Sequence, residues 1–131
     1  MRLVDTDILI DHFHGVVAAT EYIADALLSD GELFISVVSV TEILAGMRTG
    51  EEAKTEELFA LFTIQPVNET IARAAGKYLN QFAASHRLEL GDSIIAATAR
   101  SLNAELITRN VKHYPMGDLI VRAPYERGRK K

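Results

Sequence analysis

Residues 3–11 read LVDTDILID, and this stretch decides the fold class of the 131-residue chain. The apolar run over residues 2–4 ends at Asp5, which is typical of a buried strand in a parallel sheet. Apolar residues then return with helical spacing at residues 8–13, and Gly15 ends this segment. The segment therefore predicts a strand that passes directly into a short helix.

Strand and helix patterns alternate along the rest of the chain. Strands are predicted over residues 33–38, 63–67, 105–108 and 119–122. Pro66 interrupts the second of these, so we expect that strand at an edge of the sheet. Helices are predicted over residues 18–28, 39–47, 51–62, 68–85 and 91–102. We therefore expect one α/β domain over residues 1–131, in which helices cover both faces of a parallel sheet.

The composition limits the classes of protein to be considered. Hydrophobic residues make up 48% of the chain, which favours a packed domain over disorder. There is no cysteine, no signal-peptide pattern and no apolar run long enough for a bilayer, so we expect a cytoplasmic protein without membrane contact. The net charge of −4 argues against a general DNA-binding protein but is compatible with a nuclease whose basic residues are local. We expect the basic tail, residues 126–131, to be a flexible, solvated terminus.

Four polar residues stand where a strand pattern ends or a helix pattern begins: Asp5, Glu42, Asp92 and Asn110. In a parallel α/β sheet these positions lie at the carboxyl ends of the strands, where ligands bind. Carboxylates gathered there are costly to bury unless a cation lies among them. Oxygen ligands suit a divalent metal ion, so the four residues are candidate metal ligands.

Each acid also has an ordinary structural interpretation. Either Asp5 or Asp7 could cap the first helix, and we interpret Asp7 as a cap or supporting residue. Ser39 and Glu42 have the spacing of a capping box, and Asp92 could be a first-turn acid that the helix dipole favours. Taken singly, these positions leave the choice open.

In their order and context, the four signatures resemble those of the PIN-domain ribonucleases, most closely the toxin-type members called VapC. This resemblance implies a three-layer α/β/α sandwich with strand order 3-2-1-4-5. It also implies Mg²⁺- or Mn²⁺-dependent endonucleolytic cleavage of RNA, with Asp5, Glu42 and Asp92 at the acidic positions. Asn110 matches the fourth polar position, where the family commonly has an acid. Toxin-type members further imply a homodimer and a small antitoxin protein.

Basic residues near these signatures are candidates for binding an RNA phosphate. Arg109 and Lys112 flank Asn110, and Arg48 follows the predicted helix that carries Glu42. Short basic runs in loops are more often solvated surface. His113 could also contact a phosphate, whereas His14 and His86 are expected to be surface residues.

Two other functions remain open. Asp5-Thr6-Asp7 and Gly91-Asp92-Ser93 resemble motifs of the haloacid-dehalogenase-type phosphohydrolases. Against this, Leu9 stands where that family has Thr or Val, and Ala96 stands where it has an acid. The chain could instead be a catalytically silent RNA- or protein-binding module, if the neutral Asn110 leaves the metal site too weak.

Overall fold

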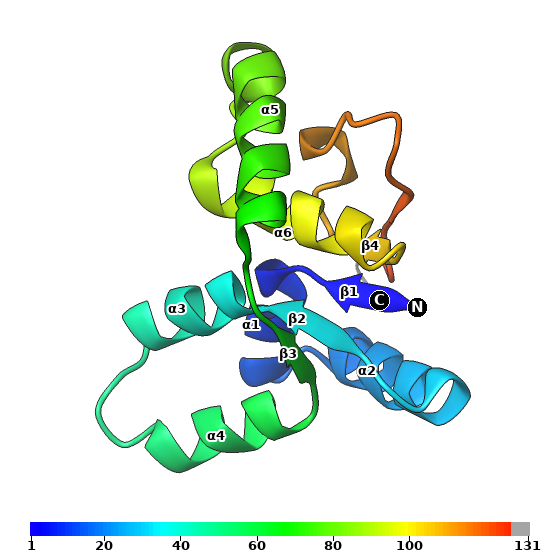
Figure 1. Cartoon of the computed structure of the whole chain (residues 1–131). Coiled ribbons are helices and arrows are strands. Elements are labelled where there is room, and N and C mark those ends of the chain that lie inside the picture. The colour runs from blue at the N-terminus through cyan, green and yellow to red at the C-terminus, as the bar shows by residue number, and fades with distance from the viewer. Residues whose placement is uncertain (127–131) are drawn as a thin grey trace.

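The computed structural model describes residues 1–126, so most of the basic tail lies outside the described residues. The strands are β1 Arg2–Val4, β2 Phe34–Ser36, β3 Thr63–Gln65, β4 Glu105–Ile107 and β5 Val121–Arg122. The helices are α1 Thr6–Phe13, α2 Val17–Asp30, α3 Val37–Ala45, α4 Glu52–Ala60, α5 Glu69–His86 and α6 Leu90–Ser101, with a 3-10 turn η1 at Val111–His113. Helices and strands follow the predicted order (Figure 1).

The strands form one parallel sheet in the order β3-β2-β1-β4-β5, which confirms the order that the resemblance implied. In the central strand, Leu3 pairs with Phe34 on one side and with Leu106 on the other. Pro66 follows β3 directly, at the edge of the sheet, as predicted. Because all strands are parallel, their carboxyl ends lie along a single rim.

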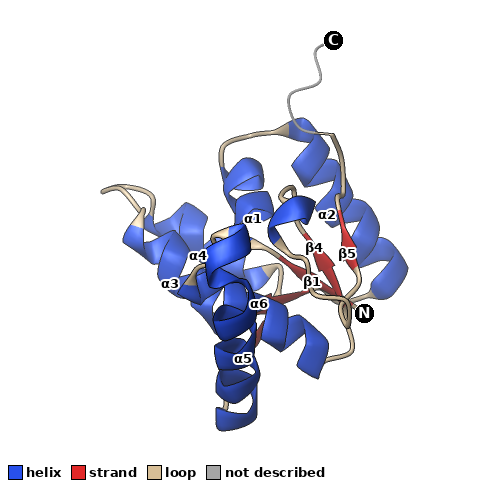
Figure 2. Ribbon diagram, turned by 90° about the horizontal axis from the view of Figure 1, so that it is seen from above, coloured by secondary structure: helices blue, strands red, loops and turns tan. Residues whose placement is uncertain are grey.

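Alternating side chains of the strands divide the core into two halves. Leu3 and Leu106 pack toward α5 and α6, whereas Val4 and Ile107 pack toward α1, α2 and α4. All four are fully buried, and burying each contributes roughly 1.5–3 kcal/mol. The result is a three-layer sandwich, in which helices enclose the strands from both faces (Figure 2). A register shift would reverse these faces, so the packing also fixes where each strand ends.

Helix α3 begins two residues earlier than predicted. The expected strand over residues 33–38 ends at Ser36, whose Oγ accepts a hydrogen bond of 3.1 Å from the Val38 N–H and so caps the helix. The valines that suggested a longer strand are helical here, because the cap and the packing override their β propensity. Ser39 is therefore not the cap, and the capping-box interpretation of Glu42 is wrong.

The long helix α5 begins as predicted. Asn68 caps it, since its side-chain oxygen accepts a hydrogen bond of 2.9 Å from the Ile71 N–H. Helix α6 packs against it through small buried residues such as Ala96 and Ala99. Within residues 1–126, none of the helices combines the length and the apolar character needed to cross a bilayer.

Candidate metal and active site

Asp5 lies at the carboxyl end of β1 and is only 7% exposed. It caps α1, since Oδ1 accepts a hydrogen bond of 2.7 Å from the Thr6 N–H. Its other oxygen, Oδ2, accepts hydrogen bonds from the hydroxyls of Thr108 at 2.8 Å and of Tyr114 at 2.9 Å. Asp5 is thus both a helix cap and the centre of a buried polar cluster that distant segments build.

Asp7 supports this cluster from the first turn of α1, and it is not the cap. Its Oδ2 accepts hydrogen bonds from the Arg109 N–H at 3.0 Å and from the Thr108 hydroxyl at 3.2 Å. Its Oδ1 is buried and has no hydrogen-bond partner in the described part of the chain. A buried carboxylate oxygen without a donor is unfavourable, so the cluster is suited to a cation or to a bound proton.

Burial, and after it the neighbouring carboxylate of Asp7, raises the pKa of Asp5, which comes to about 7. The hydrogen bonds from Thr108 and Tyr114 act in the opposite direction. The pKa of Asp7 is also raised, chiefly by burial. Without a metal ion, the native state therefore holds a proton on this pair at a pH where an exposed carboxyl group has lost it.

This shift predicts how stability depends on pH in the metal-free protein. Between about pH 4 and 7 the native state binds the Asp5 proton and the unfolded state does not, so the free energy of unfolding falls as pH rises. The slope that Asp5 contributes is at most about 1.4 kcal/mol per pH unit. Urea unfolding in EDTA across this range measures it. In Asp5→Asn that part of the slope should vanish, and identical slopes in the two proteins would contradict the expectation.

Asp92 lies in the first turn of α6 and is joined to Asp5 through Tyr114. The Tyr114 hydroxyl, 2.9 Å from Asp5, is 3.4 Å from Asp92 Oδ1. Asp92 Oδ2 accepts a hydrogen bond of 3.1 Å from the Glu89 N–H and lies 2.8 Å from Nε2 of His113. The interpretation of Asp92 as a first-turn acid is thus correct, and the same carboxylate also belongs to the site.

Tyr114 is a site residue that the sequence did not indicate. It is buried, and burial together with the two carboxylates raises the pKa of its hydroxyl, which therefore stays protonated and donates. An aromatic residue after a short basic run looks like an ordinary core residue. Only its position between Asp5 and Asp92 shows that it orders the two carboxylates.

Glu42 reaches the same region from the exposed side of α3. Its Oε1 accepts a hydrogen bond of 2.5 Å from the hydroxyl of Thr6, the residue after Asp5. Its Oε2 lies against Gly91, the residue before Asp92, so closely that a Cβ atom there would be 2.6 Å away. Glu42 therefore lies over the starts of α1 and α6, beside the buried Asp5 and the half-buried Asp92.

The three acids share the rim that the sequence predicted but do not yet face one point. The Tyr114 hydroxyl lies between Asp5 and Asp92, and Thr6 contacts Asp5 through its backbone N–H and Glu42 through its hydroxyl. Within residues 1–126, no three His, Asp or Glu side chains are grouped closely enough to hold a metal ion as they stand. The ligand type suits Mg²⁺ or Mn²⁺, whereas binding requires these side chains to turn toward a common centre.

The remaining predicted residues lie around this rim. Asn110 is exposed, and it lines a hollow together with Lys112 rather than joining the three acids. Arg109 forms an ion pair with the buried Asp11, with 2.8 Å between Nε and Oδ2, and Tyr125 donates to the same carboxylate. This contact ties the segment after β4 to α1, so Arg109 is neither solvated surface nor directed mainly at the rim.

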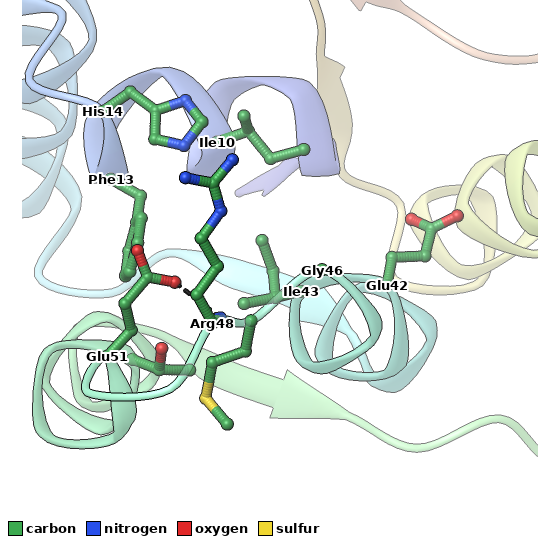
Figure 3. Close-up of a pocket in the computed structure, with 10 residues that line it drawn as sticks. Ile10, Phe13, His14, Glu42, Ile43, Gly46, Arg48 and Glu51 are labelled. Atoms are coloured by element: carbon green, nitrogen blue, oxygen red, sulfur yellow. Dashed lines mark hydrogen bonds between the residues drawn. The ribbon is translucent and has the colours of Figure 1, made fainter.

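Arg48 lies farther away, in a groove between α1 and the α3–α4 pair. The groove has a volume of about 330 Å³ and is partly lined by Ile10, Phe13 and Ile43. In Figure 3 the Arg48 guanidinium extends toward His14 on α1, while Glu42 lies on the opposite side of Ile43. The groove therefore connects Arg48 with one of the three acids.

Comparison with known proteins gives a consistent result. The family profile described as PIN domain matches residues 2–118. Ribonuclease VapC10 of Mycobacterium tuberculosis is 49% identical over 117 residues, which cover 88% of this chain and 87% of that protein. Ribonuclease VapC19 of the same organism is 38% identical over 117 residues, covering 88% and 94%. A toxin–antitoxin complex from Klebsiella pneumoniae contains a chain with a TM-score of 0.77 and 31% identity, covering 96% of this chain and 99% of that one.

Proposed function

We propose that this chain, which belongs to the PIN-domain family, is a metal-dependent endoribonuclease and the toxin of a toxin–antitoxin pair. The observation that carries the proposal is the buried Asp5 at the end of β1, which Tyr114 joins to Asp92. The VapC10 and VapC19 relatives are ribonucleases by name, and they support this assignment. The buried Oδ1 of Asp7, which accepts no hydrogen bond from the described residues, supports a cation beside Asp5.

Asp5, Glu42 and Asp92 would hold the ion, Mg²⁺ or Mn²⁺, and Asn110, which lies apart from the three acids, would have to turn toward them to serve as a fourth ligand. When bound, such an ion lowers the pKa of a water molecule and offsets negative charge on the phosphate. The chain itself orients the carboxylates: Thr108 and Tyr114 hold Asp5, and His113 holds Asp92. Arg48, Arg109 and Lys112 remain candidates for binding the RNA phosphates.

The test is cleavage of single-stranded RNA by the purified full-length chain. We expect cleavage in Mn²⁺ or Mg²⁺ and none in EDTA. RNA that is bound but not cleaved in millimolar Mn²⁺ would identify a silent binding module instead. The phosphohydrolase interpretation is not favoured, because the family match is to the PIN domain and Leu9 and Ala96 depart from the dehalogenase motifs.

The proposed partner is a small antitoxin protein, in keeping with the toxin–antitoxin complex from Klebsiella pneumoniae. The groove that Figure 3 shows offers apolar side chains of Ile10, Phe13 and Met47 to an amphipathic segment. Glu42 lies at the edge of this groove, so a basic side chain of the partner could reach the acids. The absence of cysteine fits a reducing compartment, and we place the protein in the cytoplasm.

A homodimer is also proposed, from apolar side chains that the described chain leaves in solvent. On α2, Val17 is 66% exposed and Leu28 is 85% exposed, and on α3, Leu44 is 43% exposed. A two-fold contact through α2 and the α3–α4 pair would cover such residues. Light scattering at micromolar concentration should give about twice the chain mass of 14.4 kDa. A monomer that retains full cleavage would contradict the dimer.

A further inference from the structure

The end of α5 and the turn η1 border a shallow, open hollow beside the candidate active site. We call it the basic hollow, and its lining residues are Ser85, His86, Arg87, Asn110, Lys112 and His113. None of them is acidic, and Arg87 with Lys112 gives a formal charge of +2 with the histidines neutral. The chain as a whole carries −4, so this is a local concentration of positive charge in an acidic protein.

The side chains of the two cations in the basic hollow form no ion pairs within the described chain. Neither Arg87 nor Lys112 forms an ion pair with any residue of the described chain. In contrast, most other arginines in residues 1–126 are paired with an acid, namely Arg2, Arg73, Arg100, Arg109 and Arg122. The charges of the basic hollow therefore remain available to a ligand.

The backbone holds Arg87 at the hollow at a conformational cost. As the C-cap of α5 it adopts φ 54°, a left-handed conformation that glycine or asparagine takes more easily. The next residue, Leu88, is 4% exposed and packs in the core, which anchors the turn. An arginine kept in this conformation, next to an anchored residue, has a defined starting point on the rim of the hollow.

The basic hollow is continuous with the acid cluster through His113. This residue lines the hollow, and its Nε2 lies 2.8 Å from Asp92 Oδ2. A strand of RNA that reaches Asp92 must bring phosphates toward several carboxylates, which repel them. Lys112, the residue before His113, and Arg87, which lines the same hollow, offset that repulsion and hold the strand.

We propose that the basic hollow binds a phosphate of the RNA strand next to the cleaved bond, with Arg87 and Lys112 as its cationic contacts. The planar guanidinium of Arg87 suits two phosphate oxygens, and the Lys112 ammonium adds a point charge. This inference rests on the proposed ribonuclease function, which it extends to a second phosphate position. Besides Lys112, it adds Arg87 as a second contact to the phosphate, and the sequence did not suggest Arg87.

The test compares two double variants that each remove two positive charges. The hollow variant is Arg87→Gln/Lys112→Gln, and the control variant is Arg73→Gln/Lys77→Gln, whose residues lie within α5. Fluorescence anisotropy with labelled single-stranded RNA, in an Asp5→Asn background, measures binding as KCl is varied. At 0.1 M salt the hollow variant should bind roughly tenfold more weakly, and its slope of log K against log salt should be shallower by about 1.4. The control variant should keep the affinity and the slope of the background.

A cleavage assay then separates this inference from the function on which it rests. In the chain with intact acids, the hollow variant should raise KM roughly tenfold and leave kcat nearly unchanged. If the unsubstituted chain cleaves RNA but affinity and KM are unchanged in the hollow variant, the basic hollow is not a phosphate site. If RNA is never cleaved but its binding still weakens in the hollow variant, the phosphate site stands and the nuclease proposal fails. Loss of antitoxin binding with unchanged RNA affinity would overturn the inference in favour of a protein contact.

Discussion

Replacing Asp92 with asparagine is expected to reduce RNA cleavage by about 100-fold or more, because even residues that only support metal ligands commonly cost 10- to 100-fold. Asparagine keeps the shape and can still accept the hydrogen bond from the Glu89 N–H, so α6 should start normally. The substitution removes the negative charge of the carboxylate, which would attract and hold the metal ion. Gel-based RNA cleavage in Mn²⁺ gives the rate, and circular dichroism confirms the fold.

Metal binding provides a second measurement on the same variant. Mn²⁺ should raise the melting temperature of the unsubstituted chain, because the ion binds the native state, and Asp92→Asn should lose most of that shift. The matched control is Asp25→Asn, an exposed acid of α2, which should keep both the cleavage rate and the shift. Full cleavage in folded Asp92→Asn would remove this residue from the active site.

Gly91→Ala should reduce cleavage about tenfold without destabilising the protein. The new Cβ atom would lie 2.6 Å from Glu42 Oε2, so the carboxylate must move away from the starts of α1 and α6. Glu42 is exposed and its carboxylate ends a flexible side chain, so the movement costs little folding energy. Alanine is the better helix former by up to about 1 kcal/mol, which offsets that cost. The cleavage rate and the urea midpoint report the two effects separately.

Gly76→Ala is the control for this substitution. Gly76 lies within α5, where an added Cβ would meet no atom within 4 Å, so stability should rise and cleavage should be unchanged. Combining Gly91→Ala with Glu42→Gln should give no further loss, because both act on the same carboxylate. An unchanged rate in Gly91→Ala, with Glu42 shown to be needed, would mean that this carboxylate works from another position.

Much of the fold follows from short-range patterns in the sequence. The alternation of apolar strands with amphipathic helices is encoded locally, and Asn68 and Pro66 mark boundaries by their own chemistry. The strand order came from the resemblance to a family rather than from those patterns. The start of α3 was misplaced, because valines favour a strand whereas Ser36 and the surrounding packing make them helical.

Of the residues that form the site, only the charged ones could be predicted from the sequence. Asp5, Glu42 and Asp92 stood out because acids at strand ends are costly to bury, and the structure brings them to one rim. Tyr114 and Gly91 did not stand out, since one resembles a core residue and the other a spacer. The ion pair of Arg109 could not be predicted for a related reason, because its partner Asp11 is buried by packing that the sequence does not display.

The hydrogen bond between Tyr114 and Asp5 joins residues that are 109 positions apart. Asp5 follows β1, the first strand of the sheet in sequence order, yet β1 pairs with β4, the fourth strand. A chain cut before β4 would therefore lack Thr108 and Tyr114, the two residues whose hydroxyls hold Asp5. Without these hydroxyls the Asp5 carboxylate keeps only one of the three hydrogen-bond donors described for it, the Thr6 N–H, so the chemistry proposed for Asp5 depends on the segment that follows β4.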